Sequence, residues 1–171
     1  MKEYTNYKAL NAIKFRDDII ITDGSTKSVI RASDSLVLIS EIRFPLGLAA
    51  TNDDLWVGDR EAGKVIQVID NGELLPEPII IADSLSFPEG LALLSNNSLL
   101  VVESGIGRLS SINFETGKVS VVTDGLKLDI SDPTDQGVSS MKLFNGVAVG
   151  PSGFIYITGD GANVLYRIDP K

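Results

Sequence analysis

Three stretches of this chain are variants of one sequence motif, and this repeat constrains the fold more than any single residue does. Each stretch has small and apolar residues around a glycine, followed by a second, more strongly apolar run. The copies lie at 44–59, 87–103 and 143–159, with a weaker copy at 11–23. Their anchor positions are spaced 36, 43 and 56 residues apart. A period of roughly 40–50 residues built from short strands is typical of the blades of a β-propeller.

Within each copy the pattern predicts short strands rich in Val, Ile and Leu with turn residues between them. The first strand carries small residues such as Ala49, Gly90 and Ala148, which suits the crowded strands nearest a propeller axis. The second strand is apolar throughout, so we expect it to be buried between blades, with Trp56 in the core. The sequence therefore predicts one all-β domain over 1–171, a propeller of about four four-stranded blades at 11–43, 44–86, 87–142 and 143–171.

The last copy stops after its third strand, which would leave a sheet edge unpaired. Residues 2–8, which precede the first copy, are placed to supply the missing strand and to close a four-bladed ring. Alternatively, the chain forms an open half-ring, and two copies join into a larger closed ring. Both closures remain open at this point. A blade buries its faces only against neighbours, so self-association as a homodimer is the partner we expect.

Composition removes several classes of function. The chain has no Cys and no His, which excludes disulfides, thiolate nucleophiles, Ser-His-Asp chemistry and His- or Cys-bound zinc. A net charge of −8 argues against a nucleic-acid partner. No apolar run is long enough to span a membrane, so no membrane partner is expected. Residues 1–7 lack the apolar core of a signal peptide; this predicts a cytoplasmic location and leaves an exported parent protein open.

Three segments resemble a known group of propellers. They are Phe87–Ala92, Leu100–Glu103 and Asn145–Tyr156, and they are similar to repeats of the senescence-marker-protein/gluconolactonase superfamily, to NHL repeats and to strictosidine-synthase-like propellers. The resemblance covers residues 11–170. Members of the superfamily are typically six-bladed and longer, so it implies a shortened relative or the C-terminal part of one.

The resemblance implies a cation site at the top of the central channel. In the enzymes of the superfamily a divalent cation, usually calcium, is held there by a Glu that precedes a Gly and by Asn or Asp residues that precede other first strands. Glu89 and Asn145 match these positions, whereas Leu10 and Leu46 occupy the other two and cannot ligate. Half of a hard-cation site is thus expected in each chain, and a two-fold dimer would bring two halves to one channel. Alternatively, neither residue binds a ligand: Asn145 forms a turn with Gly146, and Glu89 is a solvated residue at the rim of the channel.

Acidic residues recur at the end of the second strand, as Asp23, Asp59 and Glu103. A repeated acid at a strand end usually accepts hydrogen bonds from backbone N–H groups of the adjoining turn, and we expect that role here. Glu103 is also the best candidate for a catalytic base.

An insertion at 125–140 separates the third and fourth copies, and long loops in compact domains are often functional. It contains Asp129, Asp132 and Asp135. Their spacing lacks the alternation and closing Glu of an EF-hand calcium loop, so they are expected to belong to a ligand-facing or interaction loop.

Two functions follow. The favoured one is a propeller binding module, non-catalytic or of degenerate activity, with a small-molecule or cation site at the top of the channel. The alternative is a divalent-cation-dependent lactonase or esterase, in which the cation polarises a carbonyl and a carboxylate activates water.

Overall fold

The computed structural model of the chain describes residues 3–95, 97–128, 144–159 and 162–169. Within these ranges it contains fifteen strands and a single short 3₁₀ helix, η1 (Ser104–Ile106). The all-β prediction is therefore confirmed. No helix in the described part of the chain is long and apolar enough to cross a membrane.

The strands form four antiparallel sheets in chain order, and each sheet is one blade. The first blade is formed by β1 (Ala9–Phe15), β2 (Asp18–Asp23), β3 (Ser28–Arg31) and β4 (Leu36–Ile39). The second contains β5 (Pro45–Ala50), β6 (Leu55–Asp59), β7 (Lys64–Asp70) and β8 (Glu73–Ala82). The third contains β9 (Pro88–Ser95), β10 (Ser98–Glu103), β11 (Arg108–Asn113) and β12 (Val119–Thr123). The fourth has three strands, β13 (Val147–Val149), β14 (Ile155–Gly159) and β15 (Val164–Ile168).

The first strand of each blade is the inner one, and neighbouring inner strands pack closely. β1 lies against β5, β5 against β9, and β9 against β13. A Cβ atom on Gly47 would lie 2.0 Å from the carbonyl oxygen of Glu89, and one on Gly90 would lie 2.6 Å from that of Asn145. The backbone of the following blade thus occupies the space that a side chain would need at Gly47 and Gly90. This agrees with the prediction of small residues on the inner strands.

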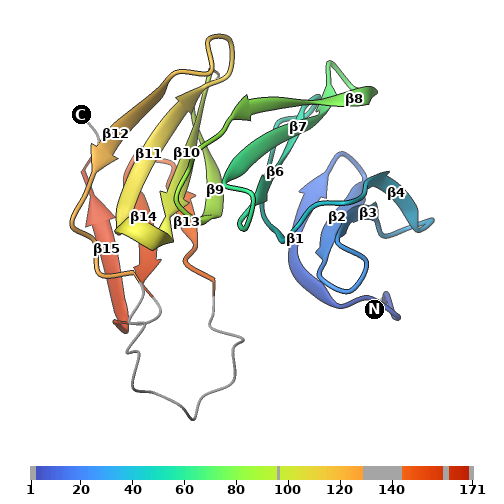
Figure 1. Cartoon of the computed structure of the whole chain (residues 1–171), viewed down its shortest axis with the longest axis horizontal. Helices are drawn as coiled ribbons and strands as arrows, with labels where there is room; N and C mark the ends of the chain where they lie inside the picture. Colours follow the sequence, from blue (N-terminus) through green and yellow to red (C-terminus); the bar gives the residue numbers. More distant parts are fainter. Residues whose placement is uncertain (1–2, 96, 129–143, 160–161, 170–171) are drawn as a thin grey trace.

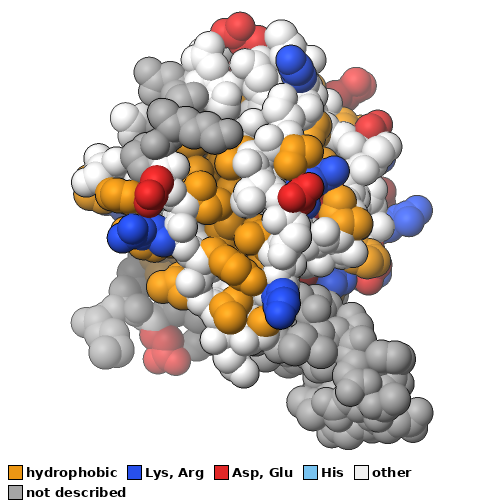
Figure 2. Space-filling model, turned by 90° about the vertical axis from the view of Figure 1, so that its left-hand side faces the viewer, with side chains coloured by type: hydrophobic (Ala, Val, Ile, Leu, Met, Phe, Trp, Pro, Cys, Tyr) orange, Lys and Arg blue, Asp and Glu red, His pale blue; other side chains and the backbone are white. Residues whose placement is uncertain are grey.

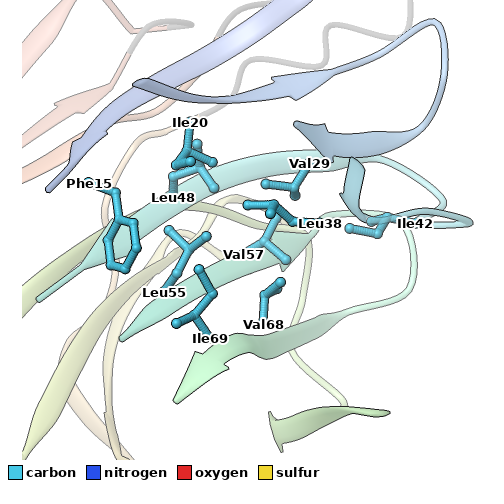
Figure 3. Close-up of a cluster of buried hydrophobic side chains, with 10 residues drawn as sticks. All are labelled: Phe15, Ile20, Val29, Leu38, Ile42, Leu48, Leu55, Val57, Val68 and Ile69. Carbon is cyan, nitrogen blue, oxygen red and sulfur yellow. The ribbon is translucent and has the colours of Figure 1, made fainter. Parts of the chain in front are cut away.

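The hydrophobic core is divided into layers between successive blades. Figure 3 shows the layer between the first two blades, where Phe15 and Ile20 meet Leu55 and Val57. In the next layer Trp56 packs with Leu99 and Val101 and stacks on Phe114, with ring centroids 4.6 Å apart. The core prediction for Trp56 is therefore confirmed.

The third layer joins the last two blades, with Leu100 and Val102 packed against Ile155 and Ile157. Side chains alternate along a strand, so β6 and β10 each contribute to two layers. Their residues are buried on both faces, apart from Ser98 at the start of β10.

The four blades follow one another along an open arc, and the N and C termini lie on opposite sides of the molecule (Figure 1). Within the described residues, β13 and β1 do not pack as the other inner strands do. The structure thus has the open arrangement of the two that the sequence left possible.

Residues 2–8 were expected to form the fourth strand of the last blade, and the structure differs from this expectation. Residues 3–8 contain no strand and lie at the first blade. The Tyr7 hydroxyl is 2.6 Å from the Ser35 hydroxyl oxygen, and the Lys8 N–H donates to Asp23. The physical reason is the open arc, which keeps the start of the chain away from β15.

Candidate functional site

The predicted site residues that the structure describes lie at one end of the propeller, which we call the hub end. Here the inner strands begin and the second strands end, so Ala9 pairs with Asp23, Pro45 with Asp59 and Pro88 with Glu103. Asp23, Asp59 and Glu103 are all buried. The recurrent acids therefore occupy one equivalent position in three blades.

Asp59 shows the role of this position most simply. Its carboxylate accepts hydrogen bonds from the backbone N–H groups of Arg43 and Phe44, which lead into β5, and of Ala62 in the following turn. The carboxylate thereby joins the start of the inner strand to the turn after the second strand. This confirms the structural interpretation for Asp59.

Asp23 repeats the arrangement in the first blade. Burial by itself would raise the pKa of Asp23, but the Ser25 hydroxyl and the backbone N–H groups of Thr26, Ser25 and Lys8 donate to the carboxylate and lower the pKa to about 2. The carboxylate is therefore held in its charged form.

Glu103 has the same kind of surroundings, with an ion pair added. Its carboxylate is fully buried and accepts from Arg108 Nε at 2.9 Å, Arg108 Nη2 at 3.0 Å, Ser110 Oγ at 2.6 Å and the Ser86 N–H at 3.0 Å. Burial opposes ionisation, yet the hydrogen bonds from Arg108 and Ser110 keep the pKa of Glu103 below its usual value. A carboxylate accepts about four hydrogen bonds, and a low pKa makes a weak base. These contacts favour a structural role over the catalytic one.

Glu89 and Asn145 are brought into direct contact. The backbone N–H and the side-chain amide of Asn145 both donate to Glu89 Oε2, at 2.9 and 2.7 Å. Both residues are buried. Glu89 lies in β9 and Asn145 precedes β13, so the contact joins the third and fourth blades.

Two further residues join this group, and sequence reasoning missed both. Arg60 Nε donates to Glu89 Oε1 at 2.8 Å, and Ser104 Oγ donates to the same oxygen at 2.9 Å. Arg60 and Ser104 each directly follow the recurrent acid of their blade, but the first blade has Gly24 there, so no repeated residue type marked this position. We call Arg60, Glu89, Ser104 and Asn145 the hub network.

The Glu89 carboxylate of the hub network already has partners other than a metal cation. Glu89 is already paired with a guanidinium and receives four N–H or O–H donors. The described residues also contain no group of three or more acids that could hold a metal ion together. Leu46, at the equivalent position in the second blade, is buried. Asp129, Asp132 and Asp135 lie outside the described residues.

The outward side of the hub network carries a cation and an aromatic ring. The Arg60 guanidinium carbon lies 4.7 Å from the centroid of the Phe87 ring. The Arg60 side chain is 26% exposed and Phe87 is 46% exposed. Phe87 also has φ of +52°, a left-handed conformation that costs a non-glycine residue roughly 1–2 kcal/mol. Eight other non-glycine residues of the described chain also have a positive φ, so this conformation alone does not mark a site.

Comparison with known proteins places the fold. No family profile matches the sequence, and no curated protein sequence matches it. Among solved structures, virginiamycin B lyase from Staphylococcus aureus matches 99% of this chain over 59% of its own length, with 12% identity and a TM-score of 0.65. A chain of a nidogen/laminin complex matches 90% over 56% of its length, with 13% identity and a TM-score of 0.68. The computationally designed Ika4 protein matches 99% over 95% of its length, with 10% identity and a TM-score of 0.60.

The chain is thus a β-propeller of the structural kind shared with these proteins. It spans about three fifths of the lyase and nearly the whole of the designed protein. At these identities the likeness concerns the fold alone.

Proposed function

We propose that the chain is a non-catalytic propeller binding module that works as a ring completed by a second copy of itself. One observation carries the proposal. The middle strands of the second and third blades are buried on both faces, whereas β14 in the last blade is buried on one face and exposed on the other.

The exposed face of the last blade has a definite set of residues. Tyr156 and Thr158 point away from the third blade, because Ile155 and Ile157 of the same strand point toward it. Ala148 and Arg167 pair with Tyr156, and Leu165 pairs with Thr158. Together these five residues form what we call the open face.

The open face has an apolar centre. Leu165 is 67% exposed and Tyr156 is 37% exposed. Figure 2 views the molecule from the left of Figure 1, where strands of both the third and the last blade lie, and shows hydrophobic side chains along the middle of that side, with charged groups around them. An exposed apolar patch with a polar rim is typical of a protein interface.

A second copy suits this face because it continues a series of interfaces already present in the chain. Each blade packs its following face on the preceding face of the next blade. On the first blade, the corresponding residues Ile21 and Ile30 pair across β2 and β3. Both are already buried within one chain, so a second copy would pack on the residues that cover them. Two arcs related by a two-fold axis would place each first blade on the open face of the other copy. Symmetry doubles the buried area, so each contact needs only about half of the roughly 1,200–2,000 Å² of a stable interface.

Absence of catalysis is supported by the state of the acids. Glu89 and Glu103 are both paired with an arginine, and the chain has no His or Cys. A divalent-cation-dependent lactonase or esterase is the second candidate, supported by the match of Glu89 and Asn145 to the cation-ligand positions of the superfamily that the repeats resemble. The repeat motif and the propeller fold also support a relationship to the senescence-marker-protein/gluconolactonase superfamily.

The mass of the protein in solution tests self-association. We expect light scattering and sedimentation to give twice the chain mass at micromolar concentrations. Leu165→Arg places a charge at the centre of the open face and should yield monomers. Val121→Arg is the matched control, because Val121 is 55% exposed on the outer strand β12 and its substitution should leave the dimer intact. Monomers of the unchanged protein at all concentrations would refute the proposal.

A further inference from the structure

We infer that the hub end binds a small anion that carries a flat apolar group, such as an aromatic carboxylate, with Arg60 as the anion-binding residue and Phe87 as the apolar contact. The inference rests on the proposed binding function and names the ligand class. It replaces the cation of the sequence prediction by a ligand of opposite charge.

The first step is the orientation of Arg60. Its Nε donates to Glu89 Oε1 at 2.8 Å, and Glu89 is held in turn by Ser104 and Asn145. A guanidinium has five N–H donors in a rigid fork. With Nε directed inward and fixed by a buried carboxylate, the plane of the fork is determined before any ligand arrives. A preorganised side chain loses less entropy on binding.

The second step is the availability of the remaining donors. Within the described residues, the Arg60 terminal amino groups have no hydrogen-bond or ion-pair partner, and the side chain is partly exposed. Paired N–H groups of this kind bind carboxylate or phosphate oxygens in a bidentate manner. The outward groups of Arg60 are therefore the natural contact for an anion.

The third step is the local charge. Glu89 neutralises one positive charge, and the exposed Glu61 lies next to Arg60 in the chain. Arg43 compensates, because its side chain is exposed and has no acidic partner among the described residues. The Arg60 N–H donates to the Phe44 carbonyl at 2.9 Å, so the backbones of the two arginine segments are adjacent. Arg43 and Arg60 thus lie on adjacent segments of the hub end, to which the buried Asp59 carboxylate is also hydrogen-bonded.

The fourth step is the apolar contact. Phe87 is half exposed although it is a large aromatic residue, and its backbone is in the left-handed region. Its carbonyl accepts from the N–H and the hydroxyl of Ser104, at 3.2 and 3.1 Å, which hold the segment in place. Arg60 covers part of the ring, and the rest is available to stack on a flat ligand.

Titration of the full chain with three compounds tests the inference. The compounds are benzoate, inorganic phosphate and calcium chloride, and binding is followed by calorimetry and by the NMR signal of the Arg60 Nε–H. We expect benzoate to bind more tightly than phosphate and to shift that signal, with no calcium binding. Arg60→Gln should weaken benzoate at least tenfold, which corresponds to about 1.4 kcal/mol.

Two variants sharpen the result. Phe87→Ala should weaken benzoate severalfold and leave phosphate unchanged, because only benzoate uses the ring. Arg16→Gln is the matched control, since Arg16 also lies over an aromatic ring, Phe15, and pairs with Asp53; it should change neither. The inference is overturned if neither anion binds, if Arg16→Gln weakens them as much as Arg60→Gln, or if calcium binds and Glu89→Gln removes it. The mass of the protein is measured in the same samples, so that loss of the dimer and loss of the ligand site are recorded separately.

Discussion

Two buried carboxylates of the third blade, Glu103 and Glu89, lie at the same end of the propeller but have different partners. Among the described residues, Glu103 accepts from Arg108 and Ser110 of its own blade and from Ser86 in the segment that leads into β9. Glu89 accepts from three blades. An acid recurs at the Glu103 position in the first two blades, whereas the first two blades have leucine at the Glu89 position. The comparison shows two roles. The repeated acid, Glu103, stabilises the turns and strand starts of a blade, whereas the unrepeated acid, Glu89, connects neighbouring blades and orients Arg60.

The largest expected effect comes from the repeated position. Glu103→Ala removes the partner of a partly buried arginine and leaves the Ser86 N–H and Ser110 hydroxyl without their acceptor. Loss of one member of a buried pair costs about 3 kcal/mol of unfolding free energy, measured by urea denaturation. Glu115→Ala, at an exposed acid in the turn before β12, is the control and should cost under about 0.5 kcal/mol. A Glu103 effect as small as that of Glu115 would contradict the structural role.

The second prediction concerns acid. The pKa of Asp23 is lowered from 3.8 to about 2, so the folded state binds this proton less readily than the unfolded state. The resulting stability is present above pH 4 and is lost as the pH falls from about 4 to 2. Its size is about 2 kcal/mol. Asp23→Asn should therefore flatten the fall of unfolding free energy over this range in urea titrations, whereas Asp17→Asn at an exposed turn should leave it unchanged. An equal slope in both variants would show that Asp23 is not the cause.

The third prediction tests the unrepeated acid. Glu89→Gln keeps the shape of the side chain but removes its charge and turns an amide group toward donors that need an acceptor. We expect a loss of about 1–2 kcal/mol in unfolding free energy. The NMR signal of the Arg60 Nε–H should also move toward that of a solvated arginine. An unchanged signal would mean that Arg60 is oriented by something other than Glu89.

The smallest effect is expected at Phe87, beside the hub network. Because Phe87 has φ of +52°, a glycine there relieves backbone strain that an alanine retains. Phe87→Gly should be more stable than Phe87→Ala by about 1 kcal/mol, measured by thermal and urea unfolding. If alanine is the more stable of the two, the backbone at this position is not strained, and the ring is exposed for another reason.

Part of the hub end was predictable because it repeats. The recurrent acids could be recognised from their register, and the backbone contacts expected of them are present at Asp23 and Asp59. The proximity of Glu89 and Asn145 followed from their equivalent positions before neighbouring inner strands. Arg60 was not predicted to join them, because its partner lies 29 residues away in the next blade, and no repeated pattern links the two.

By itself, the sequence determined the kind of sheet, the number of blades, the small residues of the inner strands and the buried middle strands. These features are local, since each depends on the alternation of side chains within one strand or on the recurrence of one sequence motif. Only the tertiary structure decided that the blades form an open arc, that the last blade keeps an open face, and that Glu89 is paired with Arg60. Those features depend on the angle between whole sheets and on contacts between side chains of different blades, which no short stretch of residues encodes.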